Sequence, residues 1–215
     1  MTNRMEKPLS EAVEQRRATP SFDGEPIPDA DLKKILDAGL KAPSGYNMQP
    51  WRFVVARTPE QKRRLRAASF NQAKVEEASA VIVACGDQDG WRTDLEEMIR
   101  LGREGGMTEG YAEQARTNIP AYLGNHPNLT AWLNRHVMIA VTTMMWMAEV
   151  MGYDTAPMEG YEAEKVREVL RLPLSYEVVA LLAIGHLKGL DKFNGGRFSM
   201  QRTVFDGEYG KPMRL

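Results

Sequence analysis

Four short segments of this 215-residue chain carry side chains that could hold a large polar ligand with a phosphate group. Each places Arg, Lys, Asn, Ser or bare backbone in a loop beside a regular element, as the binding of such a cofactor requires. Arginine suits phosphate because its planar guanidinium donates two parallel, charge-assisted hydrogen bonds. The segments are R-R-A-T at 16–19, P-S-G-Y-N-M-Q-P-W at 43–51, N-Q-A-K at 71–74, and P-M-E-G at 157–160, which G-G-R at 195–197 follows in the tail.

The second of these segments stands directly before an apolar, β-branched run at 52–56, which is typical of a buried strand. Pro43 and Pro50 restrict its backbone. Ser44 and Asn47 would therefore be ordered on ligand binding at little entropic cost. The composition of the loop predicts a pre-organised set of polar groups.

Several common catalytic patterns are absent. No two glycines stand at G-x-G spacing, and there is no P-loop and no G-x-S-x-G motif. The three histidines, at 126, 136 and 186, are far apart, so no metal site is expected. The one cysteine, Cys85, lies in the apolar run A-V-I-V-A-C-G and is interpreted as a small buried hydrophobe.

Charge and hydropathy exclude two classes of partner. The formal net charge is −1, which gives no electrostatic basis for binding nucleic acid or an anionic membrane. The longest apolar region, 137–148, is shorter than the roughly 20 residues that span a bilayer. The first residues are polar and do not resemble a signal peptide, so a cytoplasmic location is expected.

Helices and strands must alternate to position these segments, which indicates an α/β or α+β fold. Residues 87–129 fit the pattern poorly and are interpreted as an excursion, either a lid over the site or a mere insertion. Helix signals include Ser10 and Thr58 as N-caps, Pro59 at a first turn and Gly152 after a last turn. Helices are expected at 11–17, 30–42, 58–68, 130–151 and 161–170, and strands at 52–56, 78–86 and 176–186.

Taken together and in order, the motifs resemble the FMN-dependent nitroreductase family. The resemblance covers most of the chain except about 87–129. It implies an α+β fold for 1–215 as a single domain, with a central mixed sheet wrapped by helices, working as an intertwined homodimer with FMN at the subunit interface. It rests on EQRRATPSFDGEPI, LKKILDAGLKAPSGYNMQPWRFVV, FNQAKVEEASAVIVAC, MGYDTAPMEGYEAEKV, VVALLAIGH and GGRFSMQ.

The resemblance also implies a role for each cofactor residue. The phosphate and ribityl chain would be held by side chains and backbone from the first and last segments. The ring would be met by the loop of the partner subunit, by the N-Q-A-K segment at its pyrimidine edge, and by backbone N–H groups at its N5 and O4 side. In that order the residues are Arg16, Arg17, Ala18 and Arg197; Pro43, Ser44 and Asn47; Asn71 and Lys74; and Glu159 and Gly160.

Each residue also has a structural interpretation. Arg16 and Arg17 in isolation would be basic residues favoured near a helix C-terminus. Trp51 is expected to pack in the core rather than on a flavin. The clearest departure from the family is Pro20, where relatives often carry Lys or Arg. Because proline donates no hydrogen bond, Lys74 is expected to carry more of the stabilisation of the reduced ring, and the flavin potential to be lower.

The implied activity is hydride transfer from NAD(P)H to FMN and then to an electron-poor acceptor, such as a nitroaromatic or a quinone, in a ping-pong sequence. Flavin N5 does the chemistry, and no protein side chain is required as an acid. Reductive dehalogenation, flavin fragmentation, a low-turnover flavin-binding or sensor protein, and a cofactor-free interaction protein stay open as alternatives. The pocket mouth is expected to involve Tyr46, Trp91, Tyr111 and Tyr122.

Overall fold

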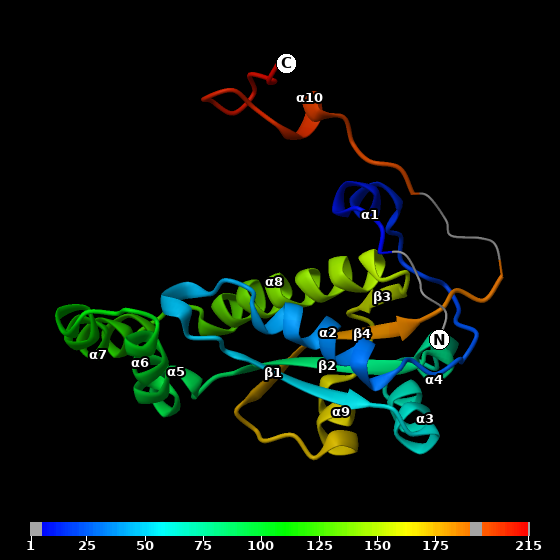
Figure 1. Ribbon diagram of the computed structural model, residues 1–215, viewed down its shortest axis with the longest axis horizontal. Helices are drawn as coiled ribbons and strands as arrows, with labels where there is room; N and C mark the ends of the chain where they lie inside the picture. The colour runs from blue at the N-terminus through cyan, green and yellow to red at the C-terminus, as the bar shows by residue number, and fades with distance from the viewer. Residues whose placement is uncertain (1–5, 190–194, 215) are drawn as a thin grey trace.

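The computed structural model describes residues 6–189 and 195–214 and builds one antiparallel sheet between two layers of helices (Figure 1). A 3-10 turn, η1, spans Gly45–Asn47 between the second helix and the first strand. The helices are α1 Leu9–Gln15, α2 Asp29–Leu40, α3 Pro59–Ala67, α4 Ala73–Glu77, α5 Gly90–Thr93, α6 Leu95–Glu104, α7 Glu109–Leu123, α8 Leu129–Val150, α9 Ala163–Leu170 and α10 Met200–Thr203. The strands are β1 Trp51–Ala56, β2 Ala80–Asp87, β3 Asp154–Met158 and β4 Tyr176–Gly185.

The sheet has the strand order β1-β2-β4-β3. All three ladders are antiparallel, and the only parallel pairing among the described residues is the isolated bridge of Ala18 with Thr155. The expected mixed sheet is therefore mixed only at that bridge. The reason is that α3 and α4 return the chain to the sheet at the end where it left, so β2 pairs antiparallel to β1, with Ala56 opposite Val81.

Alternating side chains of the strands feed two separate cores. On one face Ile82 and Leu182 pack against α2 and α8, and on the other Val83 and Leu181 pack against α3, α4 and α9. Cys85 belongs to the second core and is fully buried, as its apolar surroundings predicted. Burial raises the pKa of its thiol to about 12, so the thiol is inert at neutral pH.

The long helix α8, which the sequence predicted at 130–151, is the centre of the first core. It passes so close to α2 that a Cβ on Gly39 would lie 2.6 Å from Cγ of Met144. Gly152 follows its last turn with φ +80°, a conformation that favours glycine. No helix in the described part of the chain is long and apolar enough to cross a membrane.

Each helix and strand expected from the sequence occurs with bounds within two residues of the expected ones, but β3 and the short helices α4 and α10 were not expected. The first helix begins at Leu9 with Pro8 as its N-cap, rather than with Ser10. Strand β3 was not predicted at all. The excursion at 87–129, in contrast, contains three helices, α5 to α7, which bury Met98, Ile99 and Ile119 in a third core with the start of α8.

Candidate functional site

Left-handed backbone is concentrated in two of the predicted binding loops. Six non-glycine residues in the described ranges have a positive φ, and one of them, Arg171, merely ends α9. The other five lie in the loops around 43–51 and 70–74: Tyr46 (55°), Asn47 (56°), Gln49 (47°), Phe70 (50°) and Asn71 (56°). Such conformations are unfavourable and cluster at functional sites. The backbone therefore singles out the same loops as the side chains do.

The loop before β1 is held by its own hydrogen bonds and by one buried side chain. The hydroxyl of Ser44 accepts a hydrogen bond from the backbone N–H of Gln49 at 2.9 Å. The Gln49 side chain donates to the carbonyl of Asn47 at 3.4 Å, and the Met48 side chain enters the third core. Trp51 is buried in the first core, as predicted.

Gly45 lets this loop lie close against α8. A Cβ at Gly45 would stand 3.1 Å from the ring of Trp132 and 3.2 Å from Nε2 of His136. Pro43 and Asn47 are exposed. The loop is therefore packed on one side and presents its amide side chain on the other.

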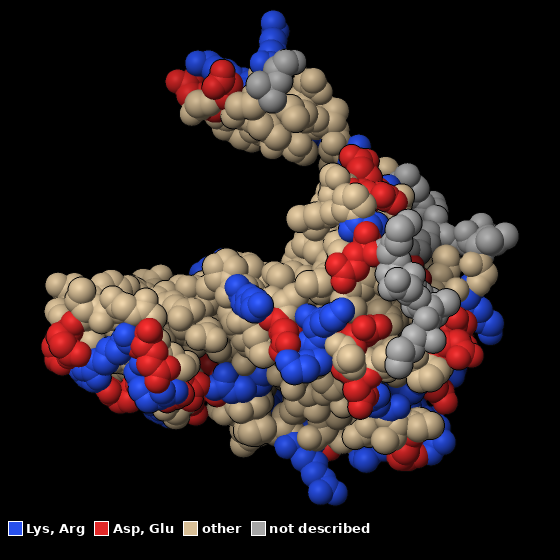
Figure 2. Space-filling view, viewed as in Figure 1, with Lys and Arg blue, Asp and Glu red and all other residues tan. Residues whose placement is uncertain are grey.

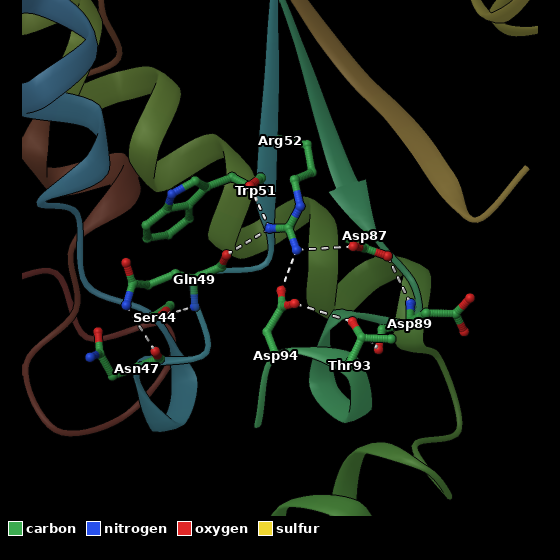
Figure 3. Close-up of polar contacts among 9 residues, drawn as sticks. All are labelled: Ser44, Asn47, Gln49, Trp51, Arg52, Asp87, Asp89, Thr93 and Asp94. Carbon is green, nitrogen blue, oxygen red and sulfur yellow. Dashed lines mark hydrogen bonds and ion pairs between the residues drawn. The ribbon is translucent and has the colours of Figure 1, made fainter. Parts of the chain in front are cut away.

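Arg52 joins this loop to the base of the excursion (Figure 3). Its guanidinium donates to the carbonyls of Gln49 and Trp51, forms an ion pair with Asp87 at 3.0 Å and another with Asp94. Burial by itself lowers the pKa of Arg52, but the hydrogen bond and charge of Asp94, together with Asp87, raise it above its ordinary value. The charge of Arg52 is therefore balanced by partners within the protein. Sequence reasoning missed this residue because its two carboxylate partners lie 35 and 42 positions away.

The N-Q-A-K and P-M-E-G segments are brought together in one chain. Nε2 of Gln72 donates to the carbonyl of Gly160 at 2.8 Å, and the N–H of Glu162 donates to the carbonyl of Ala68 at 2.8 Å. Asn71 and Lys74 therefore lie on a segment that is tied to Glu159 and Gly160. Phe70, beside them, is 64% exposed with a left-handed backbone. Sequence reasoning missed it, and its one signal is an aromatic residue directly before the polar segment.

The R-R-A-T segment is fixed to β3 and carries an unsatisfied arginine. The N–H of Thr19 donates to the carbonyl of Thr155 at 3.0 Å, next to the bridge of Ala18 with the same residue. Nη1 of Arg17 donates to the carbonyls of Glu14 and Arg16, at the end of α1. Nη1 of Arg16 is buried without a hydrogen-bond partner among the described residues.

Arg197, from the tail, is near enough to act on Arg16. Burial and then the charge of Arg197 lower the pKa of the Arg16 guanidinium below its ordinary value. Two cations whose charges repel each other, one with a buried donor that has no partner among the described residues, are a poor arrangement unless an anion joins them. The residues present here fit a phosphate group.

One chain does not bring all of the predicted residues together. Pro43, Ser44 and Asn47 stand before the first residue of β1, whereas Asn71 and Lys74 follow α3, which comes after its last (Figure 1). A six-residue strand is about 20 Å long. The loop therefore lies at the opposite end of the sheet from the segments around α4 and β3.

Two of the four residues expected at the pocket mouth meet. The rings of Tyr46 and Tyr122 have centroids 5.9 Å apart, and Tyr122 also contacts His126 edge-on at 5.2 Å. Trp91 instead packs within the excursion, where it lies 3.1 Å from a Cβ placed on Gly124. Tyr111 is exposed on the first turn of α7, eleven positions, or about 16 Å of helix, before Tyr122.

A cleft of about 840 Å³ lies elsewhere, between the start of α2, the start of β3 and the end of β4. It contains none of the predicted cofactor residues. Its carboxylates would repel a phosphate, because like charges disfavour each other at short range. They are Glu6, Asp23, Glu25, Asp31 and Asp154. No cluster of three or more metal-ligating side chains occurs among the residues that the structure describes.

Comparison with known proteins gives a consistent result. Residues 13–186 match the model of the nitroreductase family. The chain is 37% identical to an NADH dehydrogenase of Thermus thermophilus over 193 residues, covering 90% of this chain and 93% of the relative. It is 34% identical to YdgI of Bacillus subtilis, which is named among the NAD(P)H nitroreductases, with 81% and 86% covered. A protein of Exiguobacterium sibiricum solved in complex with FMN superimposes with a TM-score of 0.82 at 30% identity, with 96% of this chain and 100% of that one covered.

Proposed function

This chain belongs to the nitroreductase family, and from that premise we propose that it is an FMN-dependent oxidoreductase that takes hydride from NAD(P)H. The observation that carries the proposal is the pairing of strained binding loops with an unsatisfied arginine. Five left-handed residues fall in the two loops, and Nη1 of Arg16 is buried without a partner in the described ranges. We further propose that 1–215 forms a single domain and acts in the cytoplasm.

In this proposal the phosphate of FMN lies between Arg16 and Arg197. Arg16 has the donor and Arg197 the neighbouring charge, and both gain a partner when the anion is bound. Arg17 has a smaller part, because its Nη1 already holds the end of α1. Ala18 adds backbone, as its bridge to β3 fixes that stretch of chain.

In this proposal the flavin ring contacts the N-Q-A-K and P-M-E-G segments, which the hydrogen bond from Gln72 to Gly160 joins. Bound FMN supplies the acceptance and release of hydride. Lys74 stabilises negative charge at the pyrimidine edge, with the side chain of Asn71 beside it. Gln72 holds the carbonyl of Gly160, so that the backbone N–H groups of Glu159 and Gly160 keep one orientation. These donors need no reorganisation when charge develops.

We propose that two copies of the chain complete each site. Pro43, Ser44 and Asn47 are separated by the length of β1 from the other cofactor residues of their own chain, so they would serve the cofactor of the partner. Two surfaces support a homodimer. The C-terminal segment exposes Phe198, Met200 and Tyr209 and stands away from the body across a hollow with few charges (Figure 2). A shallow groove on α8, lined by Arg135, Met138, Ile139, Thr142, Thr143 and Trp146, offers an apolar face.

Nitroaromatics and quinones are the acceptors that we propose. Tyr46 and Tyr122 form an exposed aromatic pair at one end of the molecule, and Phe70 is exposed at the other. In a dimer of the kind proposed, the loop with Tyr46 would approach the partner's Phe70 segment. Flat aromatic acceptors gain stacking energy from such rings.

The visible spectrum of the purified protein, followed by addition of NADH or NADPH under nitrogen, tests this function. We expect a flavin spectrum that bleaches with a nicotinamide and returns on addition of p-benzoquinone or a nitroaromatic. If neither nicotinamide reduces the bound flavin, the protein would be a flavin store or sensor rather than an oxidoreductase. A protein that stays colourless after incubation with FMN would overturn the proposal. Bleaching without reoxidation by either acceptor would contradict the acceptor class and direct attention to dehalogenation or flavin fragmentation.

A further inference from the structure

Glu149 is a buried acidic residue near the end of α8, and only one of its two carboxylate oxygens is hydrogen-bonded within the described structure. The residue is 3% exposed. Its Oε1 accepts a hydrogen bond from Nζ of Lys7 at 2.8 Å. Its Oε2 is buried and has no hydrogen-bond partner among the described residues. A half-satisfied buried carboxylate is costly, so it calls for a functional reason.

Arg16 is the nearby group that Glu149 can serve. The guanidinium carbon of Arg16 lies 5.8 Å from the centroid of the Trp146 ring, one turn before Glu149 on α8. The negative charge of Glu149 opposes the effect of burial and of Arg197 on the pKa of Arg16. Arg16 and Glu149 are thus near enough for their charges to interact, and each has one buried polar atom without a hydrogen-bond partner among the described residues.

Glu149 also fixes the segment from which Arg16 projects. The N–H of Lys7 donates to the carbonyl of Val150 at 2.9 Å, while its ammonium group binds both Glu149 and Gln15, the latter at 3.1 Å. Lys7 precedes α1, and Arg16 follows it directly. The Glu149 carboxylate thus binds Lys7 before α1, and its charge acts on Arg16 after α1.

We propose that Glu149 is a positioning residue that holds Arg16 beside Arg197, ready to receive the phosphate group of FMN. This inference rests on the proposed function. Without the carboxylate, the two guanidinium groups repel each other and Arg16 leaves its place over Trp146. The binding site would then have to be assembled by the ligand, at a cost in affinity.

A comparison of FMN with riboflavin tests the inference, because riboflavin has the same ring and ribityl chain and no phosphate. Dissociation constants are measured by flavin fluorescence for the apoprotein of the wild type and of Glu149→Gln, which keeps the shape of the side chain and an acceptor for Lys7. We expect FMN to bind about tenfold more weakly to Glu149→Gln, and riboflavin to bind equally well to both. Glu14→Gln removes the same charge from an exposed position on α1 and is the matched control.

The double variant Arg16→Gln/Glu149→Gln separates positioning from a general structural role. If Glu149 acts through Arg16, its substitution has no further effect on FMN affinity in the Arg16→Gln background. Three results would overturn the inference: equal weakening of FMN and riboflavin, an unchanged or tighter FMN complex, or an additive effect in the double variant. If the wild type binds neither flavin, the proposed function itself fails, which is a different outcome.

Discussion

Arg52 and Arg16 are two half-buried arginines with opposite surroundings. Arg52 meets two carbonyls and two carboxylates, and its pKa lies above the ordinary value. Arg16 has an unpartnered Nη1 in the described structure and a neighbouring cation, and its pKa lies below the ordinary value. An arginine whose donors all have partners within the protein stabilises the fold. An arginine with an unpaired donor can instead bind a ligand that brings the missing negative charge. The contrast predicts which arginine supports the structure and which the cofactor.

The largest effect is expected for Arg52→Met, which keeps the apolar stem and removes the charge. Asp87, whose side chain is only 8% exposed, would lose its ion-pair partner. Breaking such a pair is strongly destabilising, and we expect the free energy of unfolding to fall by about 2–3 kcal/mol in urea denaturation. Arg57→Met is the control, because Arg57 pairs with the exposed Asp29 and should change stability by less than about 0.5 kcal/mol. Equal effects of the two substitutions would break the comparison.

Arg16→Met should have the converse result. It removes a half-buried cation whose Nη1 has no hydrogen-bond partner in the described chain, so the stability of the apoprotein should stay within about 0.5 kcal/mol of the wild type. Affinity for FMN should fall by about 2 kcal/mol, or roughly 30-fold, since charge-assisted hydrogen bonds to phosphate are lost. Isothermal titration with FMN measures the second quantity and urea denaturation the first. A destabilised apoprotein with unchanged FMN affinity would make Arg16 a structural residue like Arg52.

The sequence alone predicts those features of the fold that depend on local pattern. Apolar runs predicted β1, β2 and β4, and the capping residues Thr58 and Pro59 predicted the start of α3, where a capping box is observed. Strand β3 escaped prediction because D-T-A-P-M has no apolar run and contains a proline, which is tolerated here at the edge of the sheet. The order of motifs indicated the family.

The remaining features depend on contacts between distant parts of the chain. Arg52, Gln72 and Glu149 are unremarkable in sequence, and each matters through a partner that folding brings to it. Met48 lies in a polar loop, and its burial by the excursion follows no local pattern. Periodicity reports which face of an element is buried, but it does not report which buried polar atom is left without a partner.

Asn47 sharpens the comparison within the loop that Arg52 supports. The exposed Asn47 side chain lies on a left-handed residue. Asn47→Ala should weaken FMN binding by about 1 kcal/mol, or roughly fivefold, through the lost hydrogen bond. It should also reduce stability by up to about 1 kcal/mol, because alanine disfavours a positive φ. Asn47→Gly separates the two effects, since glycine accepts the conformation and lacks the amide. Full FMN occupancy of both variants after extensive dialysis would show that the loop has no part in cofactor binding.

The smallest expected effect is on the flavin potential and concerns Pro20. This residue directly follows the R-R-A-T segment that contains Arg16. The N–H of Phe22 donates to Oε2 of Glu77 at 3.3 Å, so this stretch passes beside the helix that carries Lys74. In Pro20→Lys, an added ammonium group would help Lys74 to stabilise the reduced ring. A gain of about 1 kcal/mol corresponds to roughly 20 mV for two electrons, and potentiometric titration should show a midpoint potential higher by about that amount. Pro20→Ala is the control and should leave the potential unchanged, because it adds no charge. If both variants shift the potential equally, the effect comes from the backbone. If neither does, the missing cation at this position does not limit the potential, and Lys74 does not depend on its neighbours.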